Sequence, residues 1–192
     1  MAILILGLIL FLGSHAIKMC APQWRSGMIA RLGDNTWKIL YSLVALAGFV
    51  LIIVGYGQAR VDTPWLWSPP AWTGYLTGLL MIPALILVVA GNVPSNQIKA
   101  KLGHPMVLGT AIWAAAHLIG TGSLAATVLF GSFLIWASAD YISARRRDRR
   151  AGITRPAAGA SGDIIAVVVG LALWGAFTFY LHLVLIGTSP MG

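Results

Sequence analysis

Long runs of apolar residues, each about as long as a membrane-spanning helix, alternate in this sequence with short segments that hold most of the charge. A helix needs about 20 such residues to cross the hydrocarbon core of a bilayer. Only 9% of the 192 residues are charged and 58% are hydrophobic, whereas soluble globular domains carry about 25% charged residues. The chain is therefore predicted to be an all-α integral membrane protein whose helices contact the lipid bilayer.

Six apolar runs predict a polytopic membrane protein with a single domain over residues 1–192. The first run is expected to be retained as a helix, because no A-x-A cleavage site follows it. Residues 151–162 are rich in Gly, Ala, Ser and Pro and are expected to form a flexible link. Ser161 or Asp163 is then expected to cap the last helix. The six transmembrane helices are predicted at about residues 2–18, 37–56, 73–91, 104–119, 124–142 and 164–186.

The positions of the basic residues predict how these helices are oriented. Cytoplasmic loops are enriched in Lys and Arg, and Trp residues gather at membrane interfaces. The loops at residues 18–38 and 92–103 and the basic block at 145–150 are therefore expected to be cytoplasmic, and the Trp- and Pro-rich residues 60–72 to form an outer loop that holds only Arg60. Both termini are expected on the outer, periplasmic side. The twelve basic residues on the cytoplasmic side are Lys18, Arg25, Arg31, Lys38, Lys99, Lys101, Arg145, Arg146, Arg147, Arg149, Arg150 and Arg155.

The net charge of +8 is explained by this orientation, and no nucleic-acid partner is expected. Cys20 is the only cysteine, which excludes an internal disulfide and any zinc site built on paired cysteines. The sequence also lacks a phosphate-binding loop and a dinucleotide fingerprint. The chemistry of this chain is therefore expected to depend on its histidines.

All four histidines, His15, His104, His117 and His182, fall within or at the edges of predicted helices. A single histidine in such a place most often has a packing role, but four in a sequence without glutamate favour metal binding over proton relay. Oxygen and thiolate ligands are too scarce here for Mg²⁺, Ca²⁺, zinc or an iron–sulfur cluster. Haem iron held by imidazole between apolar helices fits best, and the absence of CxxCH predicts haem b.

The helix at residues 104–119 carries a histidine near each end, and this spacing limits which histidines can share an iron. Its start is expected at His104 or Pro105, because proline fits the first helical turn. His104 and His117 are about 20 Å apart along a helix, whereas two axial imidazoles hold their Cα atoms within roughly 13 Å. Depth in the bilayer pairs His15 with His104 and His117 with His182. Trp113, one turn before His117, is expected to pack in the core or against lipid, or else against the imidazole or a porphyrin.

Several motifs make the chain resemble the NnrU family of bacterial inner-membrane proteins, which is also similar to zeta-carotene isomerase. The resemblance covers roughly residues 1–142, and its most specific part is the histidine-containing helix. The matching residues are Gly13-Ser14-His15-Ala16, Trp37-Lys38-Ile39-Leu40-Tyr41-Ser42-Leu43, Gly55-Tyr56, Leu66-Trp67, Trp72 and His104-Pro105-Met106-x-Leu108-Gly109-x-x-x-Trp113-x-x-x-His117-Leu118.

The resemblance implies a six-helix inner-membrane protein linked to denitrification and nitric oxide metabolism. The isomerase relatives imply a b-type haem that acts on a cis double bond of a lipophilic polyene, with His15 and His117 as the iron ligands. That pairing differs from the pairing by depth, and both remain open at this point. The family's Asn-Gly-Asp turn is Thr121-Gly122-Ser123 in this chain, so an isomerase-like or redox activity that needs the acidic residue is in question. The alternative is a non-enzymatic accessory or assembly subunit whose partner is a nitrite or nitric oxide reductase.

Overall fold

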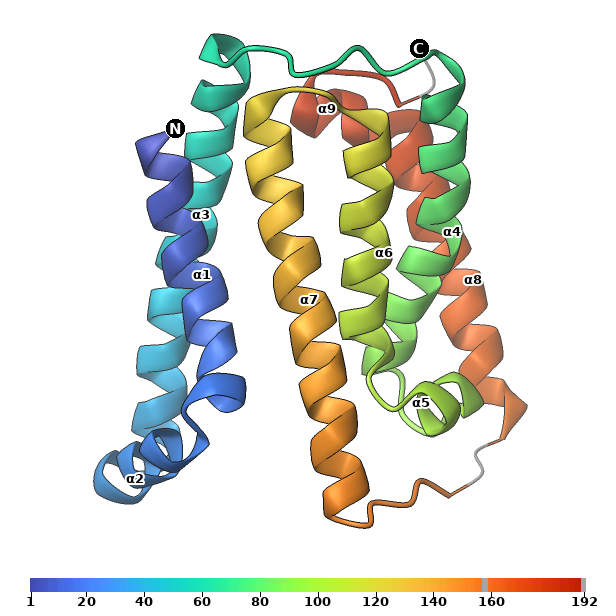
Figure 1. Ribbon diagram of the computed structural model, residues 1–192. Helices are drawn as coiled ribbons and strands as arrows, with labels where there is room; N and C mark the ends of the chain where they lie inside the picture. Colours follow the sequence, from blue (N-terminus) through green and yellow to red (C-terminus); the bar gives the residue numbers. More distant parts are fainter. Residues whose placement is uncertain (157–158, 191–192) are drawn as a thin grey trace. The chain divides into compact units, whose positions relative to one another are not determined.

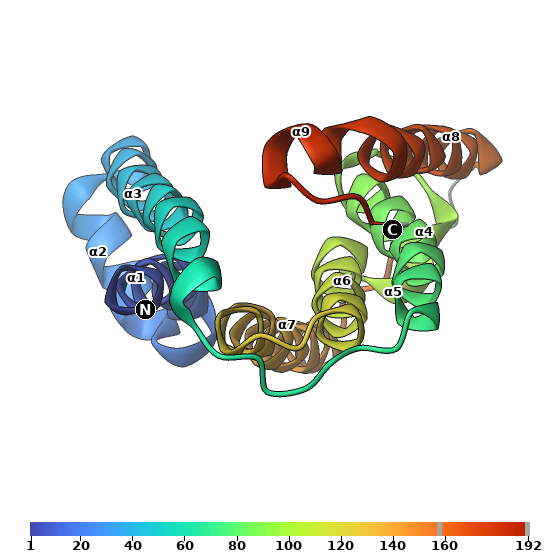
Figure 2. The same ribbon diagram turned by 90° about the horizontal axis from the view of Figure 1, so that it is seen from above.

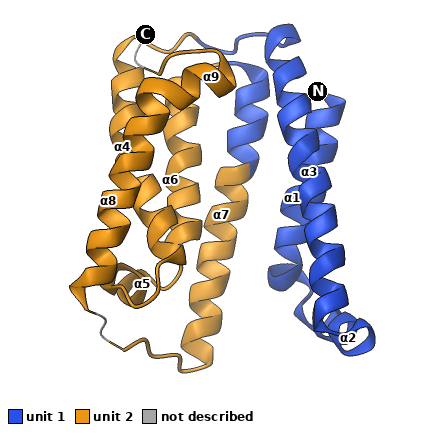
Figure 3. Cartoon of the chain, turned by 180° about the vertical axis from the view of Figure 1, so that it is seen from behind, with its two compact units in different colours: residues 1–67, 123–132 blue, residues 68–122, 133–192 orange. Residues whose placement is uncertain are grey.

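The computed structural model describes residues 1–156 and 159–190, and its regular elements in these ranges are helices (Figure 1). An isolated antiparallel bridge also joins Trp65 to Ser123. The chain divides into two compact units, residues 1–67 with 123–132 and residues 68–122 with 133–192 (Figure 3). The helices in chain order are α1 (Ala2–Cys20), α2 (Pro22–Leu32), α3 (Asp34–Asp62), α4 (Trp72–Asn92), α5 (Gln97–Leu102), α6 (Pro105–Gly120), α7 (Leu124–Arg150), α8 (Ala160–Ala176), the π-helical turn η1 (Phe177–Leu181) and α9 (His182–Ile186).

Each of the six predicted helices is present, and five are long and apolar enough to cross a membrane by length and composition. The five are α1, α3, α4, α7 and the continuous run Ala160–Ile186, which comprises α8, η1 and α9. Helix α6 has 16 residues and is therefore ~24 Å long, less than the ~30 Å of a bilayer core. The prediction of a membrane protein is supported, whereas the length of α6 does not by itself establish a sixth span.

Helices α1 and α3 pack backbone to backbone in the first unit. A Cβ atom added at Gly7 would lie 2.6 Å from the backbone nitrogen of Ile52, and one added at Gly48 would lie 2.6 Å from that of Phe11. Gly55 makes an equally close approach to the backbone of Leu4. Small residues let helices in a bilayer gain dispersion energy through such contacts, and these glycines therefore hold α1 against α3.

The segment expected as a loop over residues 18–38 contains the helix α2, while its placement on the cytoplasmic side stays a prediction. Pro22 occupies the first turn of α2, where proline needs no hydrogen-bond acceptor. Gly33, with φ +82°, allows the sharp turn from α2 into α3. Trp24 and Trp37 stack edge to face with their ring centroids 5.8 Å apart. The two tryptophans therefore fix α2 against the start of α3.

Helix α4 is central to the second unit, with α6 on one side and α8 on the other (Figure 2). A Cβ atom at Gly109 of α6 would lie 2.6 Å from the carbonyl oxygen of Ala84, and one at Gly170 of α8 would lie 2.8 Å from the Cα of Ile86. The hydroxyl of Thr77 donates a hydrogen bond of 2.9 Å to the carbonyl of Ala116. These contacts set the position of α6 along α4.

The connections of the second unit differ from the prediction in three places. Residues 92–103, expected as a loop, contain the short helix α5. The basic block at 145–150 is the last part of α7 and does not follow that helix. Helix α8 begins at Ala160 and has Gly159 at its N-cap without a side-chain cap. The expected link at 151–162 is therefore shorter, and its residues 157–158 lie outside the described residues.

Asp163 does not cap its own helix as expected. Its carboxylate accepts a hydrogen bond of 3.0 Å from the backbone N–H of Ile98 in α5. Asn96 caps α5 by accepting a hydrogen bond of 2.6 Å from the N–H of Lys99. The small helix α5 is thus held both by its own cap and by α8, and it leads the chain into α6.

Candidate functional site

His117 lies half-buried near the end of α6, and its ring is oriented by the helix backbone. Its Nδ1 lies 2.9 Å from the carbonyl oxygen of Trp113, one turn earlier. A carbonyl can only accept a hydrogen bond, so Nδ1 carries the proton and Nε2 carries the lone pair. This is the tautomer in which histidine commonly binds a metal through Nε2, because the Nδ1–H bond fixes the ring.

Trp113 forms the wall beside this imidazole. The two ring centroids are 5.4 Å apart and tilted by 52°. Phe133 of α7 packs on Trp113 edge to face at 5.3 Å. Of the roles expected for Trp113, packing against the imidazole is confirmed, and contact with a porphyrin remains a prediction.

His15 of α1 has the same arrangement in the first unit. Its Nδ1 lies 2.7 Å from the carbonyl oxygen of Phe11, which again places the proton on Nδ1. The imidazole lies between the ring of Phe11, at 4.4 Å, and that of Tyr41, at 5.4 Å. His15 therefore has the orientation of a metal-binding histidine among aromatic side chains.

His182 follows the π-helical turn η1, which interrupts the predicted helix at 164–186. One extra residue per turn changes the direction of the side chains that follow, and such turns occur often at functional sites. The Nδ1 atom of His182 lies 2.7 Å from the carbonyl oxygen of Thr188. His182 is in the same unit as His117 and is near enough for the charges of the two imidazoles to interact.

His104 differs from the other three histidines because a carboxylate holds it. It is the N-cap residue of α6, whose start at Pro105 is one of the two predicted positions, and it follows Gly103 with φ +78°. Its Nε2 lies 2.9 Å from an Oδ2 of Asp148, and Arg155 donates a hydrogen bond of 2.6 Å to the same oxygen. Asp148 is only 8% exposed. The expected pairing of His104 with His15 gains no support from this geometry.

The cluster His104–Asp148–Arg155 lies at the arginine-rich end of α7, beyond the apolar part of that helix. Burial disfavours the charge on Asp148, but the hydrogen bonds from Arg155 and His104 outweigh it and keep the pKa of Asp148 below its ordinary value of 3.8. Asp148 was not among the site residues that the sequence predicted. The sequence feature that could have drawn attention to Asp148 is its position as the one carboxylate among the five arginines of residues 145–150.

The four histidines therefore fall into two kinds. His15, His117 and His182 each donate from Nδ1 to a carbonyl, whereas His104 belongs to an ion cluster. Within residues 1–156 and 159–190, no three His, Cys, Asp or Glu side chains gather into a group that could hold a metal ion. A porphyrin supplies four equatorial nitrogens and needs only one or two protein ligands, so the predicted haem site does not require such a group and stays a prediction.

Comparison with known proteins gives one family. Residues 3–190, nearly the whole chain, match the family model described as NnrU protein. No curated protein and no solved structure matches the chain. The similarity to zeta-carotene isomerase remains an interpretation of the sequence.

Proposed function

Because the chain belongs to the NnrU family, we propose that it is a haem-b-binding protein of the bacterial inner membrane. Its activity is linked to denitrification and nitric oxide metabolism or to the cis–trans isomerisation of a lipophilic polyene. We further propose that α6 is the sixth transmembrane helix and that both termini face the periplasm. The apolar length of the other five spans supports this topology, as does the distribution of Lys and Arg.

The observation that carries the haem proposal is the Nδ1 hydrogen bond of His117 to the carbonyl of Trp113. The bond leaves the lone pair on Nε2 and restrains the ring. His117 lies in a helix whose other side chains are mostly apolar, and Trp113 offers a flat surface next to its ring. When bound, haem would supply an iron that changes oxidation state in an apolar environment; His117 would hold that iron.

Two histidines are candidates for the second axial position. His182 lies in the same unit as His117, and η1 directly precedes it. His15 is the residue that the family resemblance implies, and it has the same Nδ1 bond as His117. His104 is not a candidate in this proposal, because its Nε2 contacts Asp148.

The test is the absorption spectrum of the purified full-length protein after expression with ample haem. The wild type is expected to show a Soret band, with changes in the visible bands on reduction. If His182 is the second ligand, His182→Ala is expected to shift this spectrum and His15→Ala to leave it unchanged. If His15 is the second ligand, the opposite result is expected. A wild-type protein without any Soret band would contradict the proposal.

The second candidate function is that of a non-enzymatic accessory or assembly subunit of a nitrite or nitric oxide reductase. It is favoured by Gly13 of α1 and Gly57 of α3, where no described atom beyond the adjoining residues and the helix's own backbone lies within 4 Å of an added Cβ. Such small residues would let a helix of another protein approach closely. Co-purification with a reductase, together with wild-type reduction rates when all four histidines are alanine, would favour this function over the first.

A further inference from the structure

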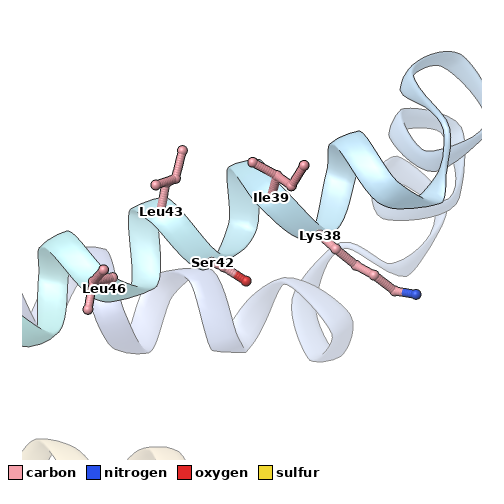
Figure 4. Close-up of a pocket in the computed structure, with 5 residues that line it drawn as sticks. All are labelled: Lys38, Ile39, Ser42, Leu43 and Leu46. Carbon is pink, nitrogen blue, oxygen red and sulfur yellow. The ribbon is translucent and has the colours of Figure 1, made fainter.

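One side of α3 carries a shallow groove of about 300 Å³ near the start of the helix (Figure 4). Its lining residues recur at helical spacing and are all exposed. Lys38 lies at the end nearest α2, and the residues beyond it are apolar except for one hydroxyl. The lining residues are Lys38, Ile39, Ser42, Leu43 and Leu46.

The segment of the chain that leads into the groove is rich in basic residues. Lys18, Arg25 and Arg31 come from the end of α1 and from α2, which the stacked tryptophans hold against α3. With Lys38, the segment 18–38 carries four cations and one carboxylate, Asp34. Its net charge is therefore positive.

The groove also has a defined direction relative to the bilayer. Helix α3 is long and apolar enough to span a membrane, and the charged segment precedes it. In the proposed topology, Lys38 is therefore expected at the headgroup level and Leu46 deeper in the bilayer. Ser42 is one turn beyond Lys38, ~6 Å along the helix axis. A cation, then a hydroxyl, then apolar side chains follow the same order as phosphate, ester and acyl chain in a phospholipid.

We propose that this groove binds one anionic phospholipid of the surrounding bilayer. Lys38 attracts the phosphate, the net positive charge of residues 18–38 adds to this attraction, and Ile39, Leu43 and Leu46 contact one acyl chain. Asp34 forms an exposed ion pair with Lys38, and an exposed pair of this kind is weak, so a phosphate can compete for the lysine. This proposal does not depend on haem binding.

A second copy of the chain is a poorer occupant of the groove. A two-fold interface places the same surface on both partners, and it would bring two sets of four cations together. Free phosphate would satisfy the lysine but would leave the apolar lining without a contact. The anionic lipid alone matches both the charge and the apolar stripe.

The test uses native mass spectrometry of the delipidated full-length protein in nonionic detergent, with phosphatidylglycerol and phosphatidylcholine of identical chains as probes. The wild type is expected to retain one phosphatidylglycerol in preference to phosphatidylcholine. Lys38→Gln is expected to weaken this binding about fivefold, because each basic residue near an anionic surface contributes about 1 kcal/mol. Lys101→Gln in α5 removes the same charge elsewhere and is the matched control.

A second variant tests the apolar part of the groove. Leu43→Trp fills it and is expected to reduce retention of phosphatidylglycerol, whereas Ile53→Trp, at another exposed position of α3, is expected to leave retention unchanged. Excess inorganic phosphate is expected not to displace the lipid. Equal binding of the two lipids, equal losses in Lys38→Gln and Lys101→Gln, or a dimer that Leu43→Trp dissociates would each overturn the proposal.

Discussion

The two ends of α6 carry the same residue type with different chemistry. At one end, the backbone carbonyl of Trp113 accepts from Nδ1 of His117, and the lone pair remains on Nε2. At the other end, the carboxylate of Asp148 contacts Nε2 of His104, and Arg155 binds the same carboxylate. The two imidazoles thus differ in their hydrogen-bond partners, a backbone carbonyl for one and a buried carboxylate for the other. In the proposed function, the first end binds the cofactor and the second end has a structural role.

The largest effect is expected from a change that displaces the whole of α6. Gly109→Leu would place a side chain against the carbonyl of Ala84, where even a Cβ lies at 2.6 Å. Because backbone must move to accept it, we expect a loss of about 3 kcal/mol in stability, measured by unfolding in mixed micelles. Gly175→Leu, where the structure describes no atom within 4 Å of the added Cβ, is the control. Equal stability of the two variants would refute the close packing of α4 and α6.

Asp148→Asn is expected to disturb only the structural end of α6. It removes the charge that the hydrogen bonds from Arg155 and His104 stabilise, and bonds of this kind contribute about 1.5–3 kcal/mol each. We expect a loss of about 2 kcal/mol in the same unfolding assay, with an unchanged haem spectrum. Asp62→Asn, at an exposed position, is the control and should change neither the stability nor the haem spectrum. Loss of the haem absorption bands in Asp148→Asn would contradict the claim that only the His117 end of α6 takes part in haem binding.

Acid is expected to weaken the same end reversibly. The pKa of Asp148 is lower in the folded protein than its ordinary 3.8. The ionised carboxylate therefore contributes its full stabilisation of the folded state above pH 3.8. It is lost as the pH falls through the folded-state pKa, when the carboxyl becomes protonated. Unfolding of the wild type should therefore become easier below about pH 4, and Asp148→Asn should lack this component. An identical pH dependence in both proteins would show that another group is responsible.

The smallest effect is expected beside His117. Trp113→Leu removes the ring that packs on the imidazole and on Phe133. Aromatic pairs contribute about 0.5–1.5 kcal/mol beyond their buried area, so haem retention during dilution should fall a few fold. Trp113→Phe keeps a ring and should retain most of the affinity. If both variants hold haem as tightly as the wild type, Trp113 belongs to the packing of α6 alone.

The sequence predicted the long helices well, because their apolar runs have the length of a bilayer. It missed α2 and α5, since short helices with several polar residues have no apolar periodicity to identify them. The extension of α7 to Arg150 was missed for a related reason. The block of arginines was interpreted as a loop, although arginine is a good helix former.

The candidate site was only partly predictable. A hydrogen bond from a helical histidine to a carbonyl one turn earlier follows from helix geometry, so the orientation of His15 and His117 could have been derived. The contact of His104 with Asp148 joins residues 44 positions apart, and nothing local in the sequence indicates it. The π-helical turn before His182 likewise depends on tertiary packing.

The most direct test compares the two ends of α6 in one measurement. Absorption spectra of haem-loaded His117→Ala and His104→Ala, oxidised and then reduced, should differ in kind. We predict that His117→Ala loses or shifts the Soret band, whereas His104→Ala keeps the wild-type spectrum and is only less stable. A wild-type spectrum in His117→Ala, or the loss of haem in His104→Ala alone, would contradict the assignment.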